Sequence, residues 1–412
     1  MIPIIVLILV FILIAVRQVG NIKLQIWQIM LLGGLAVLLS GQIAPVEALK
    51  SINIDVMLFL LGVFIIGQAL EDSGYLSHLS YRLFRRAKSL DSLILYILFG
   101  MGIFSALLMN DTLAIIGTPV VLSLARKANT QPKILLLSLA FAVTIGSVMS
   151  PIGNPQNLLI AIHGNVTNPF VTFLRYLLLP TLLNLFLAYL LLRLFYRKQF
   201  HNKPLTHSRE VINDPKLAIL SKISLIMLVS LVLAKIATVL LSLEIDFRLT
   251  YIALIAALPI IFFIPKRPGM LKRIDWYTLV FFASMFVLMQ SVWDSGVFQS
   301  AIEAANLNLA STGVIFTVSV LLSQLLSNVP LVALYLPLLM QIGTSTKGMM
   351  ALAAGSTIAG NFTILGAASN VIIIQNAEKR SDATLTFWEF ARIGGPLTVV
   401  NVVVYLLFLS IF

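Results

Sequence analysis

The chain has 412 residues, of which 59% are hydrophobic and only 11% are charged, and its mean hydropathy is +1.01. A soluble domain carries about 25% charged residues, so this composition excludes a soluble globular protein. Basic residues outnumber acidic ones by 28 to 16, an excess that in membrane proteins marks cytoplasmic loops rather than a nucleic-acid partner. The sequence has no cysteine, no HExxH pair and no P-loop, so we expect no bound cofactor and no ATP-driven chemistry.

Several stretches are apolar over most or all of the roughly 20 residues that a helix needs to cross a bilayer. In chain order they lie near residues 2–17, 24–44, 56–72, 169–195, 219–243, 249–265, 277–293 and 387–412. The first lacks a basic segment at its start and a small-residue cleavage site, which favours a retained helix over a signal peptide. Four further apolar stretches, 91–127, 133–164, 310–345 and 347–376, are interrupted by Asn, Asp, Ser, Pro and Gly. Because lipid cannot satisfy free backbone groups, these breaks must face protein or a water-filled cavity.

The positions of the basic residues favour one topology. They gather at 17–23, 82–88, 126–133, 193–222, 266–273 and 379–380. All these clusters fall on one side of the membrane if 91–127 and 310–345 re-enter as hairpins while 133–164 and 347–376 each cross once. The positive-inside rule makes that side cytoplasmic. The sequence therefore predicts an all-α protein that spans the cell membrane ten times, with two re-entrant hairpins and both termini outside.

Polar and proline positions recur in the same order in the two halves of the chain. The segment LLMNDTLAIIGTP (107–119) matches LLSNVPLVALYLP (325–337), and SPIGNPQN (150–157) matches TILGAASN (363–370). Later matches pair Phe170, Phe173, Arg175 and Asn184 with Phe387, Phe390, Arg392 and Asn401. An odd number of crossings in each half inserts the second copy upside down, a pattern common in secondary transporters. We expect a first inverted repeat over 1–200, a cytoplasmic linker over 201–216 and a second inverted repeat over 217–412.

The first hairpin tip, Asn110-Asp111-Thr112, holds the one acidic residue that the sequence does not place near a membrane surface. A carboxylate at that depth is costly and is by default a functional residue, so Asp111 is a candidate to bind Na⁺ or to carry a proton. The alternative is a helix cap, in which Asp111 accepts hydrogen bonds from the first N–H groups of the second hairpin arm. The two roles are compatible.

The second hairpin tip and the two broken helices offer neutral polar groups. At the second tip, Ser327 and Asn328 offer oxygens and an amide to a small ion, and Pro330 suits the first turn of the next helix. In SPIGNPQN the Pro and Gly residues prevent a continuous helix, which frees carbonyls for a hard cation, while the half-helix that begins near Asn157 presents N–H groups to an anion. In TILGAASN the bend is expected at Gly366. Pro and Gly also kink passive membrane helices, but matched kinks beside polar hairpin tips favour a binding site.

At these positions the sequence resembles the ion transporter superfamily with the citrate-transporter-like fold. SPIGNPQNLLIA is similar to the signature that breaks a central helix in the divalent-anion/sodium symporters. MNDTLAIIGTPVV and SNVPLVALYLP resemble the hairpin-tip motifs of those symporters and of arsenite-efflux permeases. The resemblance implies two repeats of five crossings plus one hairpin each, a homodimer joined through a scaffold domain, and elevator-like movement of a transport domain. It also implies two cation sites that flank one substrate site.

The tips and breaks together supply the expected site residues. For the substrate these are Asn110, Thr112, Asn154, Asn157, Ser327, Asn328, Thr363, Ser369 and Asn370. For the coupling ion, Na⁺ or H⁺, they are Asn110, Asp111, Ser150, Gly153, Asn328 and Gly366. The second tip lacks the Thr of the dicarboxylate symporters, and the acidic first tip is closer to the arsenite and sodium/proton antiporter branches.

The sequence thus favours an ion-coupled secondary transporter of a small inorganic or organic anion, surrounded by membrane lipid and without enzymatic activity. Because no basic residue is assigned to the core, an anion requires a bound cation or a protonated Asp111. Arsenite efflux and Na⁺/H⁺ exchange are the alternatives in the same class. A channel would show a continuous polar stripe, and an intramembrane hydrolase would need a nucleophile with a base or paired aspartates, and neither pattern occurs.

Overall fold

The computed structural model of the chain describes residues 1–16, 18–19, 22–75, 78, 84, 86–200, 212–241, 249–263, 269, 272–304, 308, 311–381 and 385–411. Its regular structure is helical apart from two antiparallel strands of two residues each, β1 (Gln18–Val19) and β2 (Ile22–Lys23). The predicted all-α fold is therefore confirmed.

Each uninterrupted apolar stretch is a helix, and each interrupted stretch breaks into two helical arms. The elements of the first half are α1 (Ile2–Val16), α2 (Ile26–Leu39), α3 (Pro45–Ser51), α4 (Ile54–Asp72), α6 (Leu90–Leu95), the π-helix η1 (Tyr96–Met101), α7 (Gly102–Leu108), α8 (Asn110–Lys127), α9 (Pro132–Ser147), α10 (Pro155–His163), α11 (Pro169–Phe195) and the 3-10 turn η2 (Arg197–Gln199). Those of the second half are α12 (Pro215–Leu240), α13 (Leu249–Phe263), α15 (Trp276–Asp294), α16 (Val297–Ala304), α17 (Thr312–Leu326), α18 (Asn328–Gln341), α19 (Thr346–Ile358), the 3-10 turns η3 (Ala359–Asn361) and η4 (Ile364–Gly366), α20 (Ala368–Ser381) and α21 (Phe387–Ile411).

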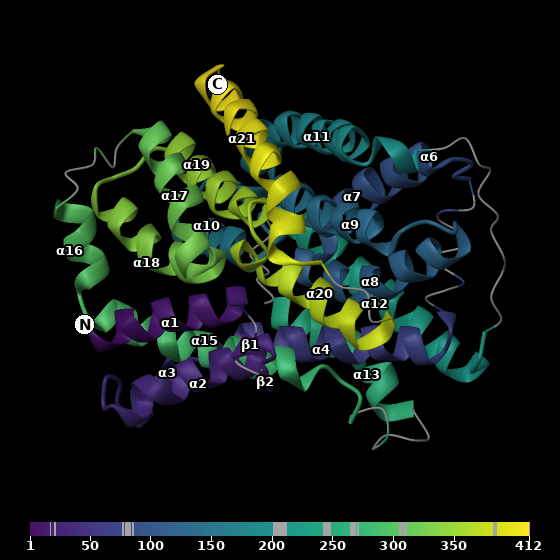
Figure 1. The fold of residues 1–412 in the computed structure, drawn as a ribbon, viewed down its shortest axis with the longest axis horizontal. Helices are drawn as coiled ribbons and strands as arrows, with labels where there is room; N and C mark the ends of the chain where they lie inside the picture. Colours follow the sequence, from purple (N-terminus) through teal and green to yellow (C-terminus); the bar gives the residue numbers. More distant parts are fainter. Residues whose placement is uncertain are drawn as a thin grey trace.

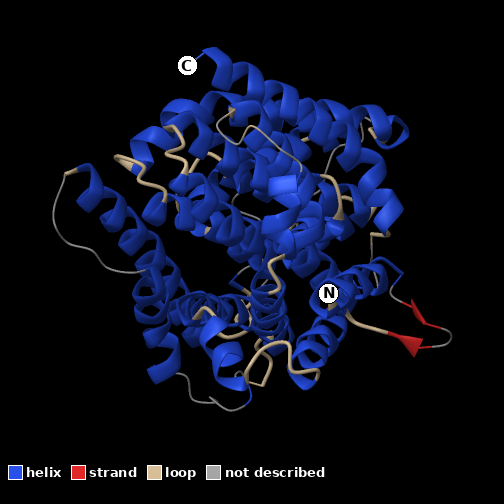
Figure 2. Ribbon diagram, turned by 90° about the vertical axis from the view of Figure 1, so that its left-hand side faces the viewer, coloured by secondary structure: helices blue, strands red, loops and turns tan. Residues whose placement is uncertain are grey.

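The helices form two layers (Figures 1 and 2). The first layer, at the bottom of Figure 1, contains α1–α4, α12, α13 and α15; in it α4 packs on α13, α13 on α12, and α15 on α2. The second layer contains both hairpins and both broken helices, with α8 against α9 and α20, α17 against α19, and α11 against α21. The layers meet where α4 contacts α8 and where α15 contacts α18. All four interrupted segments therefore belong to one layer.

The outer surface of the helices is apolar. Within the described residues, six helical stretches are long and apolar enough to cross a bilayer by length and composition: Ile54–Asp72, Leu90–Leu107, Pro169–Phe195, Pro215–Lys235, Trp276–Asp294 and Phe387–Ile411. Large apolar side chains on them, such as Leu179, Phe186 and Val403, are exposed. Exposed apolar side chains of this size and number suit lipid rather than water. The number of crossings and the side on which the termini lie stay predictions.

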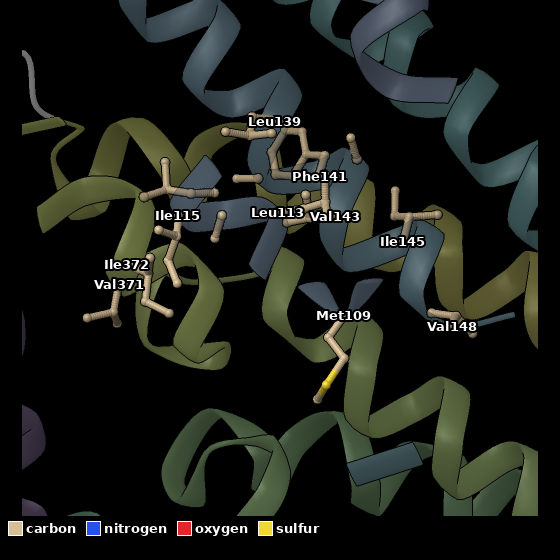
Figure 3. Close-up of a cluster of buried hydrophobic side chains, with 14 of the residues drawn as sticks. Met109, Leu113, Ile115, Leu139, Phe141, Val143, Ile145, Val148, Val371 and Ile372 are labelled. Atoms are coloured by element: carbon tan, nitrogen blue, oxygen red, sulfur yellow. The ribbon is translucent and has the colours of Figure 1, made fainter. Parts of the chain in front are cut away.

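The tip of the first hairpin, between α7 and α8, is surrounded by apolar side chains. Leu113 of α8 lies beside Val143 of α9, and Ile115 of α8 lies beside Ile372 of α20 (Figure 3). These side chains and that of Met109 are buried. Phe141 of α9 packs against Phe390 of α21, with the two rings edge-on and 5.5 Å apart between centroids. These side chains separate the polar groups at the tip from lipid. In such apolar surroundings charges interact more strongly than in water.

Glycine allows the first hairpin to approach the first broken helix closely. A Cβ on Gly146 of α9 would lie 2.2 Å from the carbonyl oxygen of Gly102 in α7, so any larger side chain would force the two backbones apart. Small residues bring membrane helices together in this way. The close contact fixes the first hairpin arm against the helix whose break it faces.

Two local features differ from the expectation or lie outside it. The first hairpin arm contains the π-helix η1, which apolar patterning does not reveal and which is often found at functional sites. Of the predicted linker 201–216, residues 201–211 lie outside the described part of the chain, and Pro215 and Lys216 already belong to α12.

Candidate functional site

Each hairpin turns at one residue with an unusual backbone conformation. Met109, between α7 and α8, has φ 67° and ψ 146°, and Ser327, between α17 and α18, has φ 64° and ψ 164°. For residues other than glycine such a conformation costs about 1–3 kcal/mol and persists only where the surrounding structure holds it. Strain of this kind gathers at functional sites, and these two residues occupy matched positions of the two sequence motifs.

In each broken helix a side-chain amide donates to carbonyl oxygens that the break releases, two of which are at matched positions in the two halves. The bonds run from Asn157 Nδ2 to Ser147 O (3.2 Å) and Ser150 O (3.0 Å), and from Asn370 Nδ2 to Gly360 O (2.5 Å) and Thr363 O (3.4 Å). Donors and acceptors occupy matched positions of the two motifs. Some of the carbonyls expected to be free for a cation thus already hold a protein partner, although a carbonyl oxygen has a second lone pair.

The hairpin tips contact the breaks directly. Asn110 donates its backbone N–H to Gly153 O at 2.8 Å, and its Nδ2 lies 3.5 Å from Ser369 Oγ in the other half of the chain. With its amide nitrogen turned toward the acceptors, Asn328 donates to Gly366 O at 2.5 Å. The structure therefore brings both tips and both breaks into one connected set of hydrogen bonds.

Thr357 of α19 joins the second half of the chain to the first break. Its Oγ1 accepts from Asn154 Nδ2 and from Gln156 Nε2, both at 3.2 Å, and lies 3.4 Å from Asn157 Oδ1. Asn154 also caps α10 by accepting from the backbone N–H of Asn157 at 2.8 Å. The side chains of the first break are thus engaged within the protein.

Some polar atoms in the same region are not engaged. Asp111 Oδ1, Thr112 Oγ1, Thr144 Oγ1 and Asn370 Oδ1 are buried and have no hydrogen-bond partner among the residues that the structure describes. The four residues are between 0% and 3% exposed and belong to α8, α9 and α20, which pack against one another. An unsatisfied buried polar group costs about 1–3 kcal/mol and calls for a specific explanation, such as a ligand.

Two predicted site residues have other surroundings. Ser327 is half-buried and lines a small apolar pocket between the layers, together with Phe11, Met285 and Val371. Thr363 donates through Oγ1 to Gln324 Oε1 at 2.9 Å, so its hydroxyl connects the second break to α17 of the second hairpin.

The sequence motifs do not single out Gln324, Thr144 or Thr357, which the structure places in the site. Gln324 reaches from α17 to the second break, where its Nε2 donates to Ala359 O at 2.7 Å. Thr144 and Thr357 stand in register six residues before Ser150 and Thr363, so extending the repeat alignment by two turns of helix would have found them. Gln324 carries no such signal, because its counterpart in the first hairpin, Ala106, is apolar.

Charged pairs lie at the ends of helices. Arg380 pairs with Glu71, Arg273 Nη2 lies 3.0 Å from Asp72 Oδ2, and Lys133 pairs with Glu389. Within the described ranges no ion pair involves a hairpin tip or a break. The polar centre therefore contains one carboxyl group, that of Asp111, and neutral donors and acceptors.

An apolar helical protein with re-entrant tips and broken helices that enclose buried polar groups has the architecture of a membrane transporter. The sequence model of the citrate transporter family matches residues 6–348, and the chain belongs to this family. It is therefore an integral membrane protein and a transporter, as the resemblance implied.

Individual relatives agree with this assignment. The silicon efflux transporter LSI3 of rice (Oryza sativa subsp. japonica) is 26% identical over 90% of this chain and 89% of its own length. An uncharacterized transporter of Mycobacterium tuberculosis is 27% identical over 87% of this chain and 86% of its own. Among solved structures, the YdaH transporter of Alcanivorax borkumensis has the same fold, with a TM-score of 0.51 and 15% identity over 89% of this chain and 86% of its own.

Proposed function

We propose that the protein is a secondary active transporter that couples the movement of a small inorganic or organic anion to Na⁺ or H⁺. The observation that carries this proposal is the buried polar centre, in which two hairpin tips and two breaks are joined by hydrogen bonds. Discontinuous helices at matched positions are typical binding sites of secondary transporters. The substrate would contact the residues named from the sequence at the two hairpin tips and the two breaks.

The charge of the centre supports coupling to a cation. An anion that enters would meet the carboxyl group of Asp111 and no basic partner within the described part of the site. Repulsion between like charges at low dielectric opposes that approach until a cation or a proton neutralises Asp111. Binding of the cation therefore favours binding of the anion, and by linkage the reverse holds equally.

The two layers support an elevator-type movement, in which the second layer carries the site past the first. The matched hydrogen bonds of Asn157 and Asn370, and of the two hairpin tips, support the inverted repeat. We propose that the first layer is the scaffold through which a homodimer forms in the cell membrane, with both termini outside.

A second candidate is export of a small weak acid, or exchange of Na⁺ for H⁺. The unpartnered acceptor oxygens Asp111 Oδ1 and Asn370 Oδ1 favour a ligand that donates hydrogen bonds. The similarity to a silicon efflux transporter points the same way.

Transport into proteoliposomes tests the proposal. The purified protein, reconstituted with a panel of labelled anions and weak acids, should accumulate or release one of them only when a Na⁺ or pH gradient is imposed. Conductance at channel rates without a gradient would contradict it. Counterflow of a weak acid driven by the gradient would select the second candidate.

A further inference from the structure

The second layer contains two positions with equivalent surroundings. We call position A the region between the start of α8, the C-terminal half of α9 and the start of α20. Position B lies between the start of α18, the C-terminal half of α19 and the start of α10. The same packing occurs at both, since α20 contacts α8 and α9 as α10 contacts α18 and α19. Each half-helix thus packs on the hairpin of the other half of the chain.

Position B is occupied by the protein itself. Thr357 of α19 faces the start of α10, where it engages Asn154, Gln156 and Asn157. At the start of α18 the residues after Asn328 are Val329 and Pro330, which have no polar side-chain atoms. At position B, the polar side chains of α19 and α10 therefore already have hydrogen-bond partners, and the start of α18 contributes apolar side chains.

Position A has the corresponding residues without the corresponding bonds. Thr144 is the counterpart of Thr357, and Asn370 of Asn157, yet Thr144 Oγ1 and Asn370 Oδ1 both lack a partner among the described residues. They are neighbours through Gly360: Asn370 Nδ2 donates to its carbonyl, and a Cβ built on it would lie 3.3 Å from Thr144 Cγ2. The third side is the start of α8, where Asp111 and Thr112 stand in place of Val329 and Pro330.

The unpartnered atoms at position A form a set suited to a cation. They are one carboxylate oxygen, two hydroxyl oxygens and one amide oxygen, which are hard ligands. A single carboxylate balances one positive charge, and the described residues contain no cluster of three or more acidic or His side chains that would hold a divalent metal.

We propose that position A binds one Na⁺, with ligands from Asp111, Thr112, Thr144 and Asn370, and that position B binds none. This inference rests on the proposed function and refines it, because it assigns one coupling ion to a site that combines the hairpin of one half of the chain with the broken helix of the other. The asymmetry comes from two substitutions in the repeat, Asp111 for Val329 and Thr112 for Pro330, and from the bonds that close position B.

The test compares Thr144→Val with its counterpart Thr357→Val in the full-length protein in detergent. Thermal unfolding is measured in choline chloride and with NaCl replacing it at constant ionic strength. A bound ion raises the unfolding temperature by mass action, so the wild type should show a Na⁺-dependent rise. Thr144→Val loses an unpartnered hydroxyl and should keep its unfolding temperature in choline but lose most of the rise. Thr357→Val loses hydrogen bonds and should unfold at a lower temperature in choline but keep the rise.

Further variants make the result decisive. Asp111→Asn should weaken Na⁺ binding about tenfold or more, because it removes the only charged ligand. If Thr357→Val does not fold, Thr357→Ser and Thr144→Ser replace the pair, and both should keep the Na⁺ response because both keep the hydroxyl. A Na⁺ response that Thr357→Val abolishes, or that Thr144→Val leaves intact, overturns the assignment. No response in the wild type also overturns it, and gradient-driven transport by the same preparation would then show that the proposed function stands with a proton as the coupling ion.

Discussion

The carboxyl group of Asp111 lies inside an apolar layer, and its Oδ1 has no partner within the described residues. Its neighbour Asn110 has three contacts: to Gly153, to Ser369 and to the backbone N–H of Asp111 itself. The hairpin tip is thus held in place by Asn110, which leaves the carboxyl group of Asp111 available to a ligand. The two adjacent polar residues of the tip therefore have different roles: Asn110 holds the tip in place, and Asp111 can bind a ligand.

Transport should depend on pH through Asp111. A proton and Na⁺ compete for an ionised Asp111, so lowering the pH should reduce the apparent affinity for Na⁺ in the wild type. Asp111→Asn cannot titrate and should lose both the Na⁺ dependence and its change with pH. Uptake into proteoliposomes, measured against Na⁺ concentration at several pH values, checks this. An unchanged Na⁺ and pH profile in the variant would leave Asp111 with a structural role only.

Breaks in helices depend on close backbone contacts as well as on Pro. A Cβ on Gly153 would lie 2.1 Å from Ser147 O, and one on Gly366 would lie 2.6 Å from Ala359 O. Because the clashing atoms belong to the backbone, they cannot move aside without opening the break. Glycine is therefore required at both bends by space, and neither is a position of positive φ.

We expect Gly153→Ala to destabilise the protein by about 1–3 kcal/mol, the usual cost of forcing extra volume into a packed interior. Gly313→Ala, near the start of α17, is the matched control, since the nearest atom to its Cβ would lie 3.9 Å away. Thermal unfolding in detergent should separate the two variants. Equal unfolding temperatures would mean that the break relaxes easily.

The contact between α11 and α21 contains a buried chain of three amides. Asn361 donates to Asn401 Oδ1 at 2.9 Å, and Asn401 donates to Asn184 Oδ1 at 2.8 Å. Asn184 and Asn401 are matched positions of the repeat, so the two halves of the chain meet here through equivalent residues. This row of three amides also connects helix α21 to the second break, because Asn361 belongs to η3.

Replacing Asn401 by Leu leaves two buried amides without a partner. We expect a loss of about 2 kcal/mol or more in the free energy of unfolding. Ser410→Ala, on the exposed end of the same helix, should have little effect. Thermal unfolding measures both, and a variant as stable as the wild type would show that water or a rearranged amide replaces the lost contact.

A salt bridge at the C-terminal end of α4 connects the two layers. Glu71 at the end of α4 pairs with Arg380 near the end of α20, while the adjacent Asp72 pairs with Arg273 just before α15. The first pair bridges the layers and the second lies within the first layer. Of these two pairs, the Glu71–Arg380 pair has to break if the layers slide past each other during transport, and the Asp72–Arg273 pair does not.

We therefore expect Glu71→Gln to shift the equilibrium away from this conformation. A pair whose side chains are about a quarter to a third exposed is worth roughly 0.5–1 kcal/mol, or about a two- to fivefold change in population. Spin labels on α4 and α20 report the distance between layers. The exchanged pair Glu71→Arg with Arg380→Glu should restore the wild-type distribution, and Asp72→Asn should leave it unchanged. A distribution that Glu71→Gln leaves unchanged would exclude a role for this contact in movement.

Much of the architecture follows from the sequence alone. A run of apolar residues specifies a helix that avoids water, and Asn, Asp, Pro and Gly inside such a run specify where it breaks, because each of them competes with or prevents the regular backbone bonds. On this basis the sequence indicated the hairpin tips and the breaks, and it named Asp111, Asn157 and Asn370 as candidate binding residues. It did so without any information on which segments are neighbours in space.

The tertiary structure decided which polar atoms have partners. Thr144 and Thr357 are the same residue type at matched positions of the repeat, yet one hydroxyl is engaged by three side chains and the other by none among the described residues. The roles of Gln324 and of the backbone of Met109 could likewise not be predicted from the sequence, because they arise from contacts between helices. Sequence patterns record where a side chain prefers to be and how the local backbone bends, whereas the satisfaction of a buried polar group depends on distances between elements far apart in the chain, and only packing sets those.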